Sequence, residues 1–236
     1  MRGAIRIWLR RLSGKSQARR GLVILAALGV VSCQCVYGAN GRLPVTTPFG
    51  DVVPAATMQN KPATALLAGS LRVVFNRTTL ADILSHFPGG TISVNHEMGA
   101  SGRYSVCYQI RSAKPTEYAW VLSDSEMGGP KHRVTEIQAT TRVLSPSESA
   151  QCGDLTKKMK VVFDNGIWLG SSARQISRTL GPPSARKGHW LGYSYEKSER
   201  HTVNGKPVTF DVGNFFQVHM ENGAVTEIDA SEVISS

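Results

Sequence analysis

Apolar and polar residues alternate along several short stretches of the first half of the chain. Alternation with a period of two is typical of strands that bury one face. Turns that contain glycine or proline separate these stretches, so we expect them to pair as antiparallel neighbours. The predicted strands cover residues 91–95, 104–111, 118–123 and 134–139.

A short helix is predicted directly before these strands. Thr79 can cap its N-terminus, with Asp82 at the third helical position. Leu80 and Ile83 then fall on one apolar face of the helix. Gly89 supplies a stop signal after this pattern.

The second half of the chain has the same order of elements. Ser171 or Ser172 can cap a helix that runs through Thr179, and Gly181 ends it. Strand patterns follow this helix, at residues 190–196, 202–203, 208–212, 215–220 and 225–228.

Two Asn-Gly dipeptides mark hairpin turns in this half, at residues 204–205 and 222–223. A type I′ turn needs positive φ at both central residues, which asparagine and glycine tolerate best. These dipeptides therefore predict that the flanking strands pair with each other in sequence order.

Two short sequences recur at nearly constant spacing. Val-Thr-Glu-Ile occurs at 134–137 and again at 225–228, an offset of 91 residues (225 minus 134). Val-Val-Phe occurs at 73–75 and again at 161–163, an offset of 88 residues (161 minus 73). This spacing indicates one structural unit that is used twice.

The predicted fold class is therefore α+β, with two tandem two-layer modules. Each module should have a short helix packed on a three- to four-stranded antiparallel sheet. Residues 69–145 are predicted to form the first module and residues 153–236 the second. Residues 39–68 are predicted to be a flexible linker, because four prolines lie among small and polar residues with little apolar periodicity.

The positive charge of the chain is concentrated at its N-terminal end. The formal net charge is +10, but residues 1–38 hold seven Lys and Arg and no acidic residue. The remainder carries 20 basic residues (27 minus 7) against 17 acidic ones. A body so close to neutrality gives no sign of a nucleic-acid surface, so no nucleic-acid partner is predicted.

Residues 1–38 have the pattern of an export signal or membrane anchor. A basic stretch precedes an apolar run at 22–31, which is short for a membrane span. Cleavage before Ala39, lipidation at Cys33 and an uncleaved anchor are three alternatives. All three export the body, so we expect a periplasmic or cell-envelope protein.

The cysteine count agrees with export. The chain has four cysteines, and cleavage before Ala39 would leave only Cys107 and Cys152. An even pair in an oxidising compartment favours a disulfide. Their wide separation, with no Cys-x-x-Cys motif, argues against a redox or metal site.

Part of the second half resembles a known family. Residues 166–176 read Gly-Ile-Trp-Leu-Gly-Ser-Ser-Ala-Arg-Gln-Ile, and Leu-Gly-Pro-Pro at 180–183 and Gly-Tyr-Ser-Tyr at 192–195 follow. This pattern resembles the SmpA/OmlA (BamE-like) domain of small envelope lipoproteins. There, glycines and a serine open a helix, a Leu-Gly-x-Pro stretch closes it, and an aromatic-rich strand comes next.

The same unit in tandem is similar to the secreted β-lactamase inhibitor proteins. The resemblance covers about 30 residues, and the first half has Phe87-Pro88-Gly89 where the family has Leu-Gly-Pro. It implies a protein-binding module that scaffolds envelope assembly or inhibits an extracytoplasmic enzyme. A fold-level resemblance does not by itself establish either role.

Motifs that would indicate catalysis are absent from the sequence. There is no nucleophile elbow, zinc-protease helix, P-loop, dinucleotide fingerprint or calcium loop. His189, His201 and His219 could meet across strands, but histidines at such spacing are usually solvated or satisfied. We therefore predict no enzyme activity, no cofactor and no metal.

Aromatic side chains are the best candidates for a binding surface, because Trp and Tyr often anchor interfaces. Packing in the core is the alternative for each of them. Phe215 and Phe216 are adjacent in a predicted strand, so one of them should lie outside the main core. The predicted partner-binding residues are Trp168, Trp190, Tyr193, Tyr195 and Phe216.

The sequence thus predicts an exported bacterial envelope protein that binds another envelope protein. Membrane anchoring through the N-terminal segment is a further expectation. An inhibitor of an extracytoplasmic enzyme and a periplasmic hydrolase are the alternatives.

Overall fold

A computed structural model describes residues 45, 47–49, 55–95, 102–111, 113–155 and 159–235. The predicted export segment at 1–38, with Cys33, lies outside the described residues, as does most of the stretch from 39 to 54.

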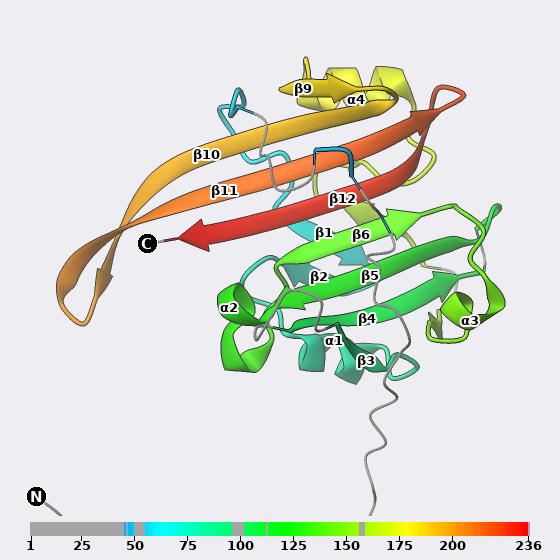
Figure 1. Ribbon diagram of the computed structural model, residues 1–236, viewed down its shortest axis with the longest axis horizontal. Coiled ribbons are helices and arrows are strands. Elements are labelled where there is room, and N and C mark those ends of the chain that lie inside the picture. The colour runs from blue at the N-terminus through cyan, green and yellow to red at the C-terminus, as the bar shows by residue number, and fades with distance from the viewer. Residues whose placement is uncertain are drawn as a thin grey trace, which may run out of the picture. The chain divides into compact units, whose positions relative to one another are not determined.

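Strands from both halves of the chain form one large sheet of nine strands (Figure 1). The order across it is β3-β4-β5-β6-β12-β11-β10-β9, with every neighbouring pair antiparallel. The ninth strand, β7, runs parallel beside β4. The bounds are β3 (Ile92–Asn95), β4 (Arg103–Ile110), β5 (Glu117–Asp124), β6 (Glu136–Thr140), β7 (Gly153–Asp154), β9 (Ala185–Lys187), β10 (Trp190–Val203), β11 (Lys206–Glu221) and β12 (Ala224–Ser235).

A second layer covers one face of this sheet. It contains a three-stranded sheet in the order β2-β1-β8 and the helices α1 and α4, whose apolar residues share one core cluster with the large sheet. The short segments α2 (Ser125–Gly128), the 3-10 helix η1 (Gly129–Lys131) and α3 (Pro146–Ser149) connect strands. The elements of the layer are β1 (Ala65–Ala68), β2 (Leu71–Val74), β8 (Val161–Phe163), α1 (Leu80–His86) and α4 (Ala173–Leu180).

Local sequence signals begin both helices and end α4 as predicted, whereas α1 ends at His86, before the predicted stop at Gly89. The Thr79 side chain accepts a hydrogen bond from the Asp82 backbone N–H, and the Asp82 carboxylate accepts one from Thr79 in return. Ser172 caps α4 by accepting from the Gln175 N–H. Gly181 ends α4 with a φ of 74°, a conformation that glycine adopts without strain.

The prediction of two separate α+β modules is wrong. The last strands of the two halves, β6 and β12, pair along their edges, so the two predicted sheets are one. A single core cluster contains Ile83 and Ile137 from the first half together with Ile176 and Ile228 from the second. The helices have only seven and eight residues and share their layer with a small sheet, so the protein is mostly β.

The physical reason is burial. Each predicted module has fewer than about 90 residues, which is small for an independent core. Pairing β6 with β12 satisfies two strand edges and lets one core serve both halves.

The pairing of β6 with β12 is symmetric about its centre. Ile137 lies opposite Ala230, and Ala139 lies opposite Ile228. Adding the 91-residue offset of the repeated tetrapeptide to 137 and 139 gives 228 and 230, so each pair maps onto the other. Gln138 and Asp229 lie opposite each other at this centre.

Both Asn-Gly turns form as predicted. Asn204 and Gly205 have φ values of 52° and 77°, and Asn222 and Gly223 have 50° and 78°. The sequence did not predict that β10 is continuous through residues 197–201, where charged residues suggested a break between strands. Pairing with β11 runs without interruption from Trp190 to the turn.

The end of the predicted linker is part of the fold. Strand β1 lies between β2 and β8, and Ala63 just before it is buried. The Lys61 ammonium lies 2.8 Å from a carboxylate oxygen of Glu232, which also accepts from the Asn214 side chain at 3.2 Å. These contacts join the segment before β1 to β11 and β12.

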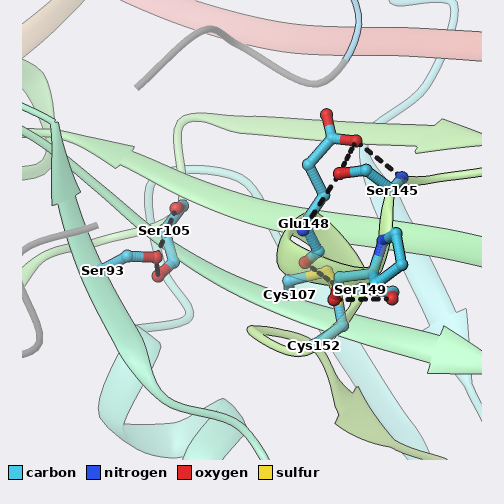
Figure 2. Close-up of a disulfide and its surroundings, with 8 residues drawn as sticks. Ser93, Ser105, Cys107, Ser145, Glu148, Ser149 and Cys152 are labelled. Carbon is cyan, nitrogen blue, oxygen red and sulfur yellow. Dashed lines mark hydrogen bonds between the residues drawn. A yellow bond between two sulfur atoms is a disulfide. The ribbon is translucent and has the colours of Figure 1, made fainter. Parts of the chain in front are cut away.

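The predicted disulfide between Cys107 and Cys152 is confirmed (Figure 2). Cys107 lies on β4 and faces away from the main core. With Leu144 and Tyr118 it forms a second, smaller apolar cluster. A capping box between Ser145 and Glu148 begins α3 beside it. The disulfide and the buried Leu144 hold this segment on the second face of the sheet.

Candidate interaction surface

The structure places four of the five aromatic residues predicted to bind a partner inside the protein. Tyr193 and Phe216 lie opposite each other on β10 and β11 and are 2% and 0% exposed. Trp168 lies in the same core, and its ring N–H donates to the Glu117 carboxylate at 2.8 Å. Tyr195 is also buried. These side chains pack the body and are not presented as a surface.

Phe215 and Phe216 point to opposite faces, as their adjacency predicted. Phe216 belongs to the main core, whereas Phe215 does not. The Phe215 ring lies over Gly213, where an added Cβ would meet ring atoms at 2.7 Å. Glycine is therefore required at this position for the ring to pack against the strand.

Trp190 is the fifth predicted residue, and it is only partly buried. Its ring centroid lies 5.1 Å from that of His219, the residue opposite it on β11. His219 also contacts His189, with ring centroids 6.0 Å apart, and its Nδ1 lies 3.0 Å from the Thr226 hydroxyl. The structure thus brings two of the three predicted histidines together.

The third predicted histidine lies elsewhere. His201 is eleven residues beyond Trp190 on β10 (201 minus 190), close to the hairpin turn. Within the described part of the chain, no group of three or more His, Cys, Asp or Glu residues could hold a metal ion.

Two carboxyl groups lie close together at the junction of β6 and β12. The Gln138 side-chain amide donates to Glu136 at 2.6 Å and to Asp229 at 3.3 Å. Its carbonyl oxygen accepts from the Val45 backbone N–H at 3.2 Å, and Val45 is 1% exposed. Arg103 forms an ion pair with Glu136 at 3.3 Å.

Burial controls the protonation of this pair. Burial raises the pKa of Glu136, and the Arg103 charge opposes that rise. Burial also raises the pKa of Asp229 well above its ordinary value, and the negative charge of Glu136 adds to this. The fully buried Gln138 lies between the two carboxyl groups and bonds to both. Val45 lies over these three side chains on the second face of the sheet.

Two open hollows lie at the C-terminal ends of the two helices. The one beside α4 has a volume of about 620 Å³, and its ionisable lining residue, Lys61, is paired with Glu232. The one beside α1 has a volume of about 500 Å³ and is lined by His86 and Asp154. His86 contacts the Ser70 hydroxyl and Asp154 pairs with Arg111, so these groups do not converge on one point.

The hairpin of β10 and β11 extends past the end of β12 (Figure 1). We call residues 196–211 of this hairpin the arm. β12 ends at Ser235, which lies opposite Asp211, so residues 199–203 and 206–210 continue as a two-stranded ribbon. Glu196, Lys197, Ser198 and Arg200 are exposed on it.

Among the described residues, no strand covers the outer edge of β10 along the arm. β9 covers this edge only as far as Gly192. At Ser194, the carbonyl oxygen accepts from the backbone N–H groups of Thr57 and Met58, each at 3.1 Å. From 195 to 203, no described strand or backbone group pairs with this edge.

Sequence reasoning missed the arm, although a signal was available. A two-residue turn at Asn204-Gly205 fixes the register, so pairing counted back from the turn continues through residues 197–201. Charged residues are unfavourable in the middle of a sheet, but they are common on exposed edge strands. The charged stretch therefore marked an edge and not the end of a strand.

Comparison with known proteins gave no relative of this chain: no family model, no curated protein and no solved structure matches it. The resemblance to the BamE-like domain therefore stays a prediction. Among the described residues, no helix has the length and apolar character needed to cross a membrane.

Proposed function

We propose that this protein is an exported bacterial envelope protein that binds another envelope protein and has no enzymatic activity. The observation that carries the proposal is the open edge of β10 along the arm. An unpaired strand edge presents backbone N–H and C=O groups that an extended segment of a partner can complete as an added strand.

The length of β10 and β11 supports this role. The core needs only the inner part of each strand, where Tyr193, Phe216 and Val218 pack. The arm adds no residue to the main core cluster, yet it orders more than a dozen residues at a cost in chain entropy. Packing in the core does not account for the length of the arm, whereas binding of a partner would.

Export is supported by two independent features. The first 38 residues have the basic and apolar pattern of an export signal. The Cys107–Cys152 disulfide suits an oxidising compartment. The resemblance to the BamE-like domain implies the same location and a protein-binding role.

The absence of enzyme activity is supported by the ionisable groups described above. The ionisable side chains of the two hollows are engaged in other contacts, and the carboxyl pair lies beneath the segment at Val45. An enzyme site needs convergent groups beside space for a substrate.

The test is in-cell photocrosslinking of the full chain. A photoreactive residue replaces Lys197 on the arm, and a matched control carries it at Glu126, which is exposed on α2. We expect one main adduct with an exported protein from the arm position, none from the control, and loss of the adduct when Ser198→Pro is added. No adduct, or the same adducts from both positions, would contradict the proposal.

A further inference from the structure

We infer that the arm pairs with the arm of a second copy of this chain, edge to edge and antiparallel, with Ser198 opposite Ser198 of the second copy. The inference rests on the proposed function, since it uses the same open edge of β10, and it names the partner.

Backbone direction selects which residues can bond across this edge. Both polar backbone groups of Ser194 point outward, because its N–H donates to the Ser184 hydroxyl and its carbonyl accepts from Thr57 and Met58. Alternate residues of a strand point their backbone groups to the same side. Because pairing with β11 has no register shift, Ser198 also points its N–H and C=O to the open edge.

The charge order along the edge is self-complementary. Residues 196–200 read Glu-Lys-Ser-Glu-Arg. With Ser198 at the centre, Glu196 lies opposite Arg200 of the second copy, and Lys197 lies opposite Glu199 of the second copy. Each contact occurs twice by symmetry, and directly opposite residues project to the same face of a sheet.

Other centres do not give this match. Moving the centre by one or two residues in either direction places no Lys or Arg opposite a Glu. Charges on an edge strand often prevent pairing, because a second copy would place like charges together. Here the order of charges favours pairing with a second copy in one register, so these charges do not prevent self-association.

The extent of free edge fits the same centre. Thr57 and Met58 occupy the edge at Ser194, which would otherwise lie opposite Thr202 of the second copy. Pairing can therefore run from 195 to 201, which is symmetric about Ser198. Seven residues per copy bury less than the roughly 1,200–2,000 Å² typical of stable complexes, so we expect a weak, concentration-dependent dimer.

Cysteine crosslinking tests the register directly. Ser198→Cys places two thiols opposite each other, at a Cα separation of about 5.5 Å that a disulfide can span. Arg200→Cys is the matched control, because its thiols would lie four residues apart along the strand, or about 13 Å. The full chain purified from the envelope is oxidised by dissolved oxygen with a copper catalyst.

We expect at least tenfold more covalent dimer from Ser198→Cys than from Arg200→Cys or the wild type, which measure any background from the native cysteines. Equal amounts from the two variants, or no covalent dimer from either, would overturn the inference.

A charge swap tests the contacts. Glu196→Arg should weaken self-association at least tenfold in analytical ultracentrifugation, because it places Arg opposite Arg200 of the second copy at both symmetric positions. Adding Arg200→Glu should restore association to within about threefold of the wild type. A wild type that stays monomeric at millimolar concentration, or a double variant that stays as weak as the single one, would overturn the inference.

The outcomes separate the inference from the proposed function. A photocrosslinked adduct with a different exported protein, together with no Ser198→Cys dimer, overturns the second copy and leaves the proposed function standing. A Ser198→Cys dimer, together with a photocrosslinked adduct of two copies of this chain, supports both, and the envelope protein bound by the arm is then a second copy of this chain. If neither product forms, both the inference and the proposed function are overturned.

Discussion

The two halves of the chain use the same order of elements but end differently. In the first half, β4, β5 and β6 have eight, eight and five residues, and a disulfide-linked segment packs on their second face. In the second half, β10, β11 and β12 have 14, 16 and 12 residues, and the outer part of the first two is exposed.

Both halves contribute similar apolar residues to one core, so the extra strand length of the second half is not explained by packing. The first half carries the crosslink, and the second half carries the strand edge that we propose binds a partner. This proposal places stabilisation and binding in different regions of one sheet.

The strongest test of this division compares two apolar truncations on β11. Phe216→Ala should lower the free energy of unfolding by about 3–5 kcal/mol, because the side chain is fully buried in the shared core. Val208→Ala on the arm should cost less than about 1 kcal/mol, because its side chain is only partly buried. Urea unfolding of both variants measures the difference, and similar costs would show that the arm is part of the stabilising core.

Removal of the disulfide tests the first half. Cys107→Ser with Cys152→Ser should lower the free energy of unfolding by about 2–4 kcal/mol, because the crosslink closes a loop with a sequence separation of 45 residues. Thermal unfolding with and without a reducing agent measures the effect. The reductant should destabilise the wild type and leave the double variant unchanged; an insensitive wild type would mean that this segment is held by packing alone.

The junction of the halves should respond to pH. The folded state raises the pKa of Asp229 by burial and by the nearby charge of Glu136, so it binds protons more tightly than the unfolded chain. The resulting stabilisation is fully present below the ordinary Asp pKa and is lost as pH rises through the raised pKa. The contribution of Asp229 to stability should therefore fall as pH rises above about 4.

Asp229→Asn should flatten this pH profile and raise the melting temperature above that of the wild type at neutral pH. Its amide oxygen can still accept from Gln138, so the local contacts are kept. The exposed Glu126→Gln is the control and should leave the profile unchanged. An Asp229→Asn protein that is destabilised equally at every pH would keep the wild-type pH profile, and would show that the titration of Asp229 does not set it.

The smallest expected effect is that of Ser198→Pro on the stability of the isolated chain. Proline removes an N–H that points away from β11 and is tolerated on an edge strand, so the cost should be below about 1 kcal/mol. Differential scanning calorimetry at a concentration below self-association measures it. A cost of several kcal/mol would mean that this edge is occupied within one chain, and the contrast between the halves would lose its meaning.

Much of the local structure could be predicted from short stretches of sequence. The capping box at Thr79, the cap at Ser172 and the stop at Gly181 act within one helical turn, so neighbours in sequence decide them. The Asn-Gly turns likewise act locally. The Cys107–Cys152 bond was predicted from the even number of cysteines left after cleavage and from the oxidising compartment that export implies.

The proposed interaction surface could not be predicted in the same way. Tyr193 and Phe216 are aromatic residues of the kind that anchors interfaces. Only the packing of the second layer shows that they belong to the core. Conversely, residues 197–201 lack the apolar–polar alternation used to predict strands. That alternation arises from a buried face, which an exposed edge strand does not need.

The sequence by itself determined the caps, the turns, most of the strands and the disulfide, since each depends on nearby residues or on the chemistry of a single pair. Only the tertiary structure decided that β6 and β12 join two sheets into one, which aromatic residues the second layer buries, and which strand edge no described residue covers. Those outcomes depend on contacts between residues about 90 positions apart, such as Gln138 with Asp229, and no local pattern specifies them.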